Sequence, residues 1–250
     1  MMFTEVPLAQ RFKAAANKGF SGVELLFPYT APASQLSELA EEAGIQLILI
    51  NTPLGDAGTD DRGTAAVPGR EAEFQEQFEL ALTYARACKV GLIHTLAGVV
   101  QEAQWQAARE VFIDNIRWAA DKAHAERTTL LLEPLNSQDV PGYFHATSAV
   151  TVDLLNSIDR PNVKLQFDFY HLQIMEGNLG VRLQECFADI GHVQFSSVPG
   201  RHEPQYGEVN APILFDLLDE LGYAGWVGSE YRPLTTTEAG LSWAKPYGIG

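Results

Sequence analysis

The segment VKLQFDFYH (163–171) alternates polar and apolar side chains up to a carboxylate. Lys164, Gln166 and Asp168 share one face of an extended chain, and hydrophobic residues share the other. Three more hydrophobic runs end on a polar residue: TLLLEPLN (129–136) on Glu133, GHVQFSS (191–197) on Gln194 and GWVGSEYRP (225–233) on Glu230. Because a lone buried carboxylate or amide is costly, four such residues at equivalent places predict that they converge on one site.

Short strand-like runs alternate with amphipathic segments along the chain. Seven strands are predicted from short runs rich in β-branched or aromatic residues: 22–28, 46–52, 92–98, 129–136, 163–169, 192–197 and 226–232. Eight helices are predicted from apolar residues three and four positions apart: 7–19, 33–44, 71–89, 107–126, 147–159, 179–191, 212–223 and 235–244. This alternation predicts an α/β fold with a parallel sheet, and eight helices favour a closed (β/α)8 TIM barrel.

The predicted strands are one fewer than the helices. The chain opens on a helix, so the first strand of the barrel is apparently missing from this chain. An incomplete barrel would expose the edges of the two strands beside the gap, which favours aggregation or oligomerisation. No linker or change in composition divides the sequence, and we predict a single barrel domain over residues 1–250.

Charge and cysteine content narrow the class of protein. The chain has 17 Lys and Arg against 32 Asp and Glu, a net charge of −15, which repels phosphate backbones and anionic lipids. We therefore expect neither a nucleic-acid nor a membrane partner. Cys88 and Cys186, the two cysteines, lie in predicted helices, and we expect buried thiols in a reducing compartment. No signal peptide or membrane-spanning run is visible, and a cytoplasmic location is predicted.

The alternation within the strands predicts where the four polar residues point. A barrel strand packs its apolar face on the helices, so its polar face points inward, near the strand ends where TIM barrels carry their chemistry. Three carboxylates and an amide oxygen suit Mg²⁺ or Mn²⁺, with Zn²⁺ or Co²⁺ as alternatives. Glu133 and Glu230, across the mouth, are candidates for acid and base. The competing interpretation is that each acid is separately salt-bridged or exposed.

Three further residues are candidates for contact with a substrate. His171 follows Asp168 by three positions, so the two side chains converge only if the strand ends near Phe169 and the chain turns. His94 and Asn51 also lie near predicted strand ends and face inward. For these two, contact with substrate and a purely structural role remain equally open.

Arg201 lies in the polar loop after the sixth predicted strand. Its guanidinium is suited to a bidentate pair with a substrate carboxylate, whereas a local pair with Glu203 is the alternative. Glu24 also faces inward, but earlier in its strand, and we expect it to be a buried structural partner of Lys164 or an arginine. The long loop 53–70 is either a lid over the mouth or a surface loop.

With these residues in view, the chain resembles the hydroxypyruvate isomerase family, part of the xylose-isomerase-like barrel superfamily. The similar segments span nearly the whole chain, and the most specific lie between residues 133 and 233. They include MMFTEVP (1–7), INTPLGD (50–56), LLLEPLN (130–136), QFDFYHLQIMEGNL (166–179), VPGRHEP (198–204) and SEYRP (229–233). Members of the family carry a first barrel strand just before the first of these segments, and this chain departs from them there.

The resemblance implies a reaction and a role for each site residue. It implies a metal-assisted interconversion of hydroxypyruvate and tartronate semialdehyde through an enediolate, with Glu133 and Glu230 as proton donor and acceptor. It places His171 and Arg201 near the substrate. It also implies a divalent cation with four ligands, which are Glu133, Asp168, Gln194 and Glu230.

Other functions use the same barrel. A 2-oxo-tetronate isomerase or a ketose 3-epimerase would use the same residues and differ in substrate. A metal-dependent apurinic endonuclease would need more histidine ligands and a basic face. An inactive binding or scaffold barrel is the non-enzymatic alternative. We expect a small 2-oxo acid or sugar-like substrate as the partner, and a homo-oligomer is compatible with the sequence.

Overall fold

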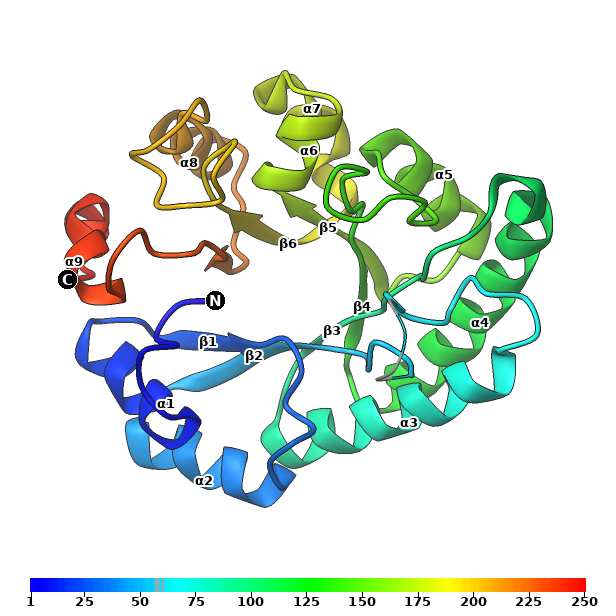
Figure 1. Cartoon of the computed structure of the whole chain (residues 1–250), viewed down its shortest axis with the longest axis horizontal. Helices are drawn as coiled ribbons and strands as arrows, with labels where there is room; N and C mark the ends of the chain where they lie inside the picture. The colour runs from blue at the N-terminus through cyan, green and yellow to red at the C-terminus, as the bar shows by residue number, and fades with distance from the viewer. Residues whose placement is uncertain (57–58, 60) are drawn as a thin grey trace.

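A computed structural model describes residues 1–56, 59 and 61–250 of the protein. Parallel strands form a single sheet in chain order that curves into a nearly closed TIM barrel, with the helices outside it (Figure 1). Within the described residues there are seven strands: β1 Gly22–Leu25, β2 Gln46–Asn51, β3 Leu92–His94, β4 Thr129–Leu132, β5 Val163–Asp168, β6 Ile190–Phe195 and β7 Val227–Ser229. The predicted fold, with one strand fewer than a complete barrel, is confirmed.

The helices follow the predicted segments, with one addition. The α-helices are α1 Leu8–Asn17, α2 Ala33–Ala43, α3 Glu71–Cys88, α4 Trp105–Ala125, α5 Ser148–Ile158, α6 Phe169–Met175, α7 Leu179–Cys186, α8 Ala211–Glu220 and α9 Thr237–Gly240. Short 3-10 turns are η1 Glu102–Gln104, η2 Phe187–Asp189 and η3 Leu241–Tyr247. Helix α6 was not among the predicted helices, because it continues directly from β5 without a glycine or proline to mark its start.

The start of α6 depends on Asp168, the last residue of β5. Its Oδ1 accepts a hydrogen bond from the backbone N–H of Tyr170 at 2.8 Å, which caps the helix. The chain therefore turns directly after Asp168. This turn brings His171 to the same side as Asp168, the condition under which the sequence predicts that the two converge.

Most strands are shorter than predicted at their carboxyl ends. Strand β4 ends at Leu132 and β7 at Ser229, so Glu133 and Glu230 each directly follow the last residue of a strand. The backbone N–H of Glu230 still donates to the carbonyl of Phe195 at 3.0 Å. Asp168 and Gln194, in contrast, lie within their strands and pair with each other in register.

The barrel interior is polar on one side and apolar on the other. Pairing of β5 with β6 sets Gln166 opposite His192 and Asp168 opposite Gln194. The intervening Phe167 and Val193 are fully buried in the large core shared with the helices. A small separate core lies within the barrel and consists of Ile48, Leu49, Leu131 and, partly buried, Leu92. The alternation of the strands therefore produces the predicted inward polar face.

The expected partner of Glu24 was wrong. Its two carboxylate oxygens contact His192 and Gln194, each at 2.7 Å, whereas Lys164 reaches outward to the carbonyl of Ala188 at 3.1 Å. Strand alternation alone places Lys164 inward. Its position near the start of β5 lets the long side chain leave the barrel at the end opposite the rim.

Strands β1 and β7 each have one edge without a strand partner among the described residues. A cavity of about 510 Å³ lies between them, lined by residues of both strands and by apolar side chains that include Phe12, Val23 and Val227. Loop 53–70 includes residues 57–58 and 60, so its predicted role as a lid lies outside the described residues. No helix of the described chain combines the length and the apolar character needed to cross a bilayer.

Candidate active site

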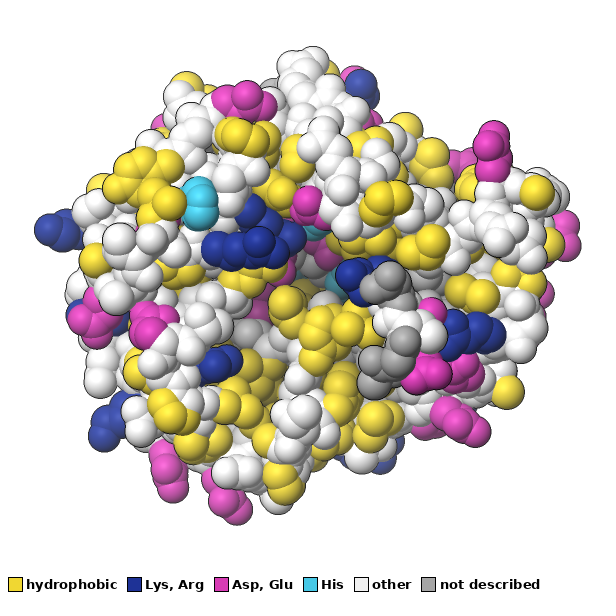
Figure 2. Space-filling model, in the orientation of Figure 1, with side chains coloured by type: hydrophobic (Ala, Val, Ile, Leu, Met, Phe, Trp, Pro, Cys, Tyr) yellow, Lys and Arg dark blue, Asp and Glu magenta, His cyan; other side chains and the backbone are white. Residues whose placement is uncertain are grey.

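The predicted site residues gather at the carboxyl ends of the strands. Asn51, His94 and Asp168 are the last residues of β2, β3 and β5, and Glu133 and Glu230 directly follow β4 and β7. Figure 2 shows a hollow near the middle of this face, with basic side chains beside it and acidic and histidine side chains deeper inside. Parallel strands bring their carboxyl ends to one rim, so residues far apart in the sequence share this hollow.

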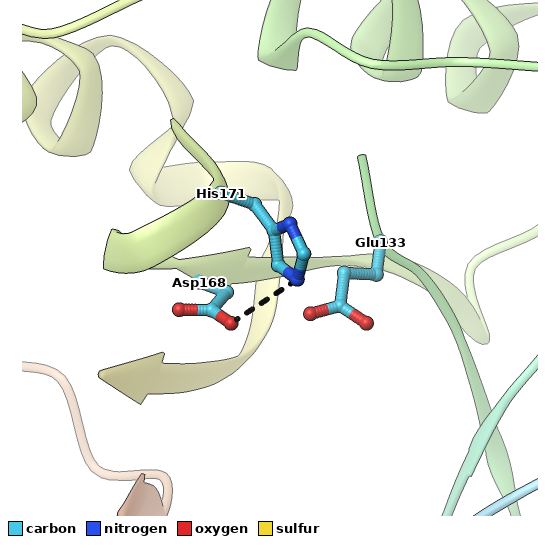
Figure 3. A group of neighbouring side chains, drawn as sticks. All are labelled: Glu133, Asp168 and His171. Carbon is cyan, nitrogen blue, oxygen red and sulfur yellow. Dashed lines mark ion pairs between the residues drawn. The ribbon is translucent and has the colours of Figure 1, made fainter. Parts of the chain in front are cut away.

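The tightest group in the hollow consists of Glu133, Asp168 and His171. One carboxylate oxygen of each acid and one imidazole nitrogen lie within 4.8 Å of one another, and all three residues are buried. Figure 3 shows both carboxyl groups pointing toward the same side of the imidazole, with a dashed line for the 3.8 Å pair between His171 Nε2 and Asp168 Oδ2. The two carboxyl groups of this set suit a divalent cation.

The second nitrogen of His171 determines what the first can do. Its Nδ1 accepts a hydrogen bond from the backbone N–H of Asn136 at 3.0 Å, and the side-chain amide of Asn136 lies 2.8 Å away. Burial and the charge of Arg201 keep the pKa of His171 well below its usual range, so the ring is neutral and its proton is on Nε2. His171 therefore faces the hollow as a hydrogen-bond donor, which favours the predicted contact with substrate over ligation of a cation.

Arg201 pairs with the acids of the hollow. Its Nη2 lies 2.9 Å from Glu230 Oε2 and 3.7 Å from Asp168 Oδ2, and its guanidinium stacks 4.6 Å above the ring of Tyr170. The alternative local pair with Glu203 does not form, because Glu203 accepts the backbone N–H of Leu234 with both oxygens. Arg201 thus binds one carboxylate already, and its buried Nε has no hydrogen-bond partner within residues 1–56, 59 and 61–250.

The backbone of Arg201 is held in a strained conformation. Its φ is 53°, in the left-handed region that costs a non-glycine residue about 1–2 kcal/mol. Two backbone hydrogen bonds maintain it: the N–H of Arg201 to the carbonyl of Ser197 at 3.0 Å, and the N–H of Arg232 to the carbonyl of Arg201 at 2.7 Å. Such strain persists where surrounding contacts impose it, and here it directs the guanidinium into the hollow.

Burial and neighbouring charges raise the pKa of two acids in the hollow. Burial raises the pKa of Glu133 well above its usual range, and the charges of Glu230 and Asp168 raise it further. Burial also raises the pKa of Asp168, to about 7, although the charge of Arg201 opposes the increase. Groups that titrate near neutral pH are the kind that exchange protons with a substrate.

His94 and Asn51 lie beside this group. His94 Nδ1 is 3.2 Å from Glu133 Oε2, and burial lowers the pKa of His94 to about 3, so the ring is neutral. Asn51 is buried, and its side-chain oxygen has no hydrogen-bond partner in the part of the chain that the structure describes. His94 contacts a proposed catalytic acid, and Asn51 offers a free acceptor at the rim. Their predicted roles in substrate binding remain predictions.

A cation would satisfy polar atoms that the protein leaves unpaired. Glu133 Oε1 and Asp168 Oδ2 are buried, have no hydrogen-bond partner among the described residues and belong to neighbouring carboxyl groups. An unpaired buried carboxylate is costly, and a bound cation removes that cost. The residues present therefore fit a divalent ion. Of the other predicted ligands, Gln194 uses its oxygen to accept from Gln166, and Glu230 is paired with Arg201.

Several residues of the site are not apparent from the sequence pattern. Asn136 fixes the tautomer of His171, Tyr170 supports Arg201, and Gln166 contacts Gln194. Asn136 follows Glu133 by three positions in an EPLN run, and Tyr170 directly precedes the proposed His171. The available signal was that Asn136 and Tyr170 lie close to predicted site residues in the sequence. This closeness does not specify which side chains are in contact.

Comparison with known proteins identifies the family of this chain. A family model described as "Xylose isomerase-like TIM barrel" matches residues 12–247. The chain belongs to this family. The 2-oxo-tetronate isomerase of Cupriavidus necator is 43% identical over 248 residues, which cover 99% of this chain and 95% of that protein. The hydroxypyruvate isomerase of Escherichia coli is 38% identical over 248 residues, covering 99% and 96%.

A solved structure with a different description is also similar. The crystal structure described as AP endonuclease, family 2, from Brucella melitensis has a TM-score of 0.96 at 44% identity, covering 98% of this chain and 95% of that chain. Membership of the xylose isomerase-like family and the named isomerases among its relatives make this chain an enzyme of the isomerase class. The predicted family and enzyme class are confirmed.

In cation-free solution, at pH values above 4.5, the ordinary pKa of a glutamate carboxyl, Glu133→Gln is expected to raise the free energy of unfolding of this family member. Below that pH the carboxyl is protonated in both states. Above it the unfolded chain ionises freely while the buried group keeps its proton, so the wild type loses stability as pH rises through the raised pKa. Glutamine has no such loss, and we expect a gain of about 1–4 kcal/mol near pH 8.

Urea unfolding in EDTA at about pH 5 and about pH 8 measures this difference. The gain should be larger at the higher pH. Glu110→Gln, on an exposed position of α4, is the matched control and should change little. A Glu133→Gln protein no more stable than wild type at either pH would contradict the burial penalty.

Proposed function

We propose that the protein interconverts a small 2-oxo acid and its aldehyde isomer, with hydroxypyruvate and tartronate semialdehyde as the leading pair. The observation that carries this proposal is the pairing of buried acids with Arg201 in a single hollow. Carboxyl groups supply proton transfer, and a guanidinium recognises a carboxylate. Relatives at 43% and 38% identity named 2-oxo-tetronate isomerase and hydroxypyruvate isomerase support the same class of substrate.

Each polar side chain has a distinct part in the proposed reaction. Glu133 and Glu230 are the two proton-transferring groups: one removes a proton from the hydroxymethyl carbon of hydroxypyruvate, and the other delivers a proton to the former carbonyl carbon. The hydroxyl proton moves between the two oxygens, so the product is an isomer. Arg201 orients the substrate carboxylate, and the Nε2–H of His171 donates to a substrate oxygen.

Glu133 and Asp168 would hold a divalent cation, Mg²⁺ or Mn²⁺ first, with Gln194 and Glu230 as the further proposed ligands. When bound, the cation would stabilise negative charge on the substrate oxygens as the proton leaves carbon. The pair between Arg201 and Glu230 adjusts to the substrate in this proposal, because Arg201 offers five donors and no described residue pairs with its Nε.

Turnover is expected with a 2-oxo acid and is expected to need a divalent cation. A coupled assay with hydroxypyruvate, 2-oxo-tetronates and uncharged ketoses, with and without EDTA, measures both. EDTA should abolish the activity and added Mn²⁺ or Mg²⁺ should restore it. Turnover of ketoses alone would instead indicate a ketose 3-epimerase. No turnover together with no bound cation would indicate a binding or scaffold barrel.

An endonuclease activity is the second candidate, because the similar Brucella structure carries that description at 44% identity. The charge of this chain opposes it, since 32 acidic residues against 17 basic ones repel a phosphate backbone. We expect no shift of a DNA duplex with an abasic site in a low-salt gel assay. Cation-dependent cleavage of that duplex would favour the endonuclease.

A further inference from the structure

A row of polar side chains lies inside the barrel, all buried except the partly buried Glu24, and has no part in the proton transfer. It consists of Glu24 on β1, His192 and Gln194 on β6, and Gln166 on β5. One carboxylate oxygen of Glu24 lies 2.7 Å from His192 Nε2, and the other accepts from Gln194 Nε2 at 2.7 Å. Both oxygens are therefore engaged by nitrogen donors, which identifies Glu24 as a carboxylate that only accepts.

This carboxylate determines which way the carboxamide of Gln194 faces. The amide has one donor end and one acceptor end, and only the donor end can bond to Glu24. Its oxygen must then point away from Glu24, where it accepts the side-chain N–H of Gln166. A reversed amide would set an oxygen against the carboxylate and lose both bonds, a cost that is high in a buried site.

The orientation matters because Gln194 stands next to the proposed cation site. It pairs in register with Asp168 on the neighbouring strand, so the two side chains lie at one level of the barrel. An amide binds a hard cation through its oxygen and not through its nitrogen. The Gln194 oxygen has two lone pairs, and the bond from Gln166 uses one of them. The orientation set by Glu24 is therefore the one in which the remaining lone pair allows Gln194 to act as a ligand.

The strand on the other side of β6 makes room for this arrangement. Gly228 of β7 pairs with Gln194, and a Cβ on Gly228 would lie 2.3 Å from Glu24 Oε1. Any side chain at position 228 would displace the carboxylate. The contact between β1 and β6 thus depends on a glycine in β7.

We propose that Glu24 is a positioning residue that holds the Gln194 carboxamide with its oxygen toward the cation site. This inference rests on the proposed function in one respect: its expected consequence is tighter binding of the proposed cation. The orientation itself follows from the hydrogen bonds of Glu24 and needs no cation.

The first test observes the amide directly. Protein labelled with ¹⁵N-glutamine gives side-chain NH₂ signals, and Gln194→Ala and Gln166→Ala assign two of them by their loss. Glu24→Gln should shift or divide the Gln194 signals, because glutamine accepts and donates and no longer selects one orientation. Glu24→Asp should shift them too, because its carboxylate is one methylene shorter. Unchanged Gln194 signals in both variants would overturn the proposal.

The second test measures Mn²⁺ affinity by calorimetry. Glu24→Gln and Glu24→Asp should each weaken binding by about tenfold, as loss of a residue that orients a ligand does. Because Glu24→Asp keeps the charge, near-normal affinity in that variant would mean that Glu24 acts through charge alone. In a Gln194→Ala background, Glu24→Gln should cause no further loss, and an undiminished loss there would overturn the proposal.

Two controls keep the outcomes separate. Glu185→Gln, at an exposed position of α7, should leave both readouts unchanged. A wild-type protein that binds no Mn²⁺ would count against the proposed cation site. In that case the NMR signals of the Gln194 side-chain amide are the test of the positioning role of Glu24.

Discussion

Glu133→Gln should reduce the isomerisation rate by roughly 100- to 10,000-fold, the usual loss when a positioned acid or base is removed. Glutamine has nearly the same shape and still offers an oxygen, but it cannot take up or release a proton. Glu133 is buried beside Asp168 and His94, and its pKa is raised by burial and by neighbouring acids. Its environment therefore favours proton exchange with a bound substrate.

The measurement is exchange of substrate C–H with deuterated water, followed by NMR alongside product formation. Glu230→Gln should show a comparable loss, since the proposed reaction uses both acids. Glu110→Gln on the exposed face of α4 is the matched control. Exchange at the wild-type rate in both active-site variants would rule out the assignment of these glutamates. The same Glu133→Gln protein should be the more stable one without cation, so a loss of rate cannot be attributed to unfolding.

Arg201→Met should lower kcat/KM for a 2-oxo acid by roughly 100- to 1,000-fold, as expected when one partner of a buried charge pair is removed. The guanidinium lies 2.9 Å from Glu230 and stacks on Tyr170, and its Nε has no hydrogen-bond partner among the residues that the structure describes. Removing it takes away the proposed clamp on the substrate carboxylate. It also removes the charge that opposes the rise in the pKa of Asp168.

A comparison of substrates separates these two effects. If Arg201 binds the carboxylate, Arg201→Met should lose more activity toward hydroxypyruvate than toward an uncharged ketose of similar size. Arg201→Lys keeps the charge without the planar fork and should recover only part of the loss. Equal losses for charged and uncharged substrates would mean that Arg201 acts only on the acids around it.

The pH profile checks the second effect. Arg201 lowers the pKa of Asp168, so Arg201→Met should move the Asp168 ionisation above about 7. The folded protein would then hold this proton to a higher pH. In cation-free protein the stability attributable to protonated Asp168 should persist further up the pH scale before it is lost.

Much of the barrel can be predicted from local patterns. The strand alternation in 163–169 places Gln166 and Asp168 on one face, and the structure pairs them with His192 and Gln194 on β6. Strand side chains alternate with a period of two whatever the rest of the chain does, so the inward face can be predicted from the sequence. The direction of the Lys164 side chain cannot be predicted in this way, because a long side chain can leave the interior at the end of a strand.

The partners within the site required the three-dimensional structure. The sequence predicts that Glu24 contacts Lys164 or an arginine. In the structure β1 faces β6 across the interior of the barrel, and the Glu24 carboxylate contacts His192 and Gln194 instead. For Arg201, the sequence allowed a local pair with Glu203 as the alternative to contact with a substrate carboxylate. The left-handed backbone at Arg201 turns the guanidinium away from Glu203 and toward Glu230.

The sequence by itself determined the barrel and the strand ends at which its polar residues lie, because hydrophobic periodicity and strand termini are local properties of the chain. Its similar segments indicated the family. Only the tertiary structure decided which of those residues touch. Glu230 pairs with Arg201 while Glu133 and Asp168 face each other beside His171, and Glu24 orients Gln194. These contacts join residues from separate strands and loops, and their distances depend on how the strands curve around the barrel and how each loop returns to its rim.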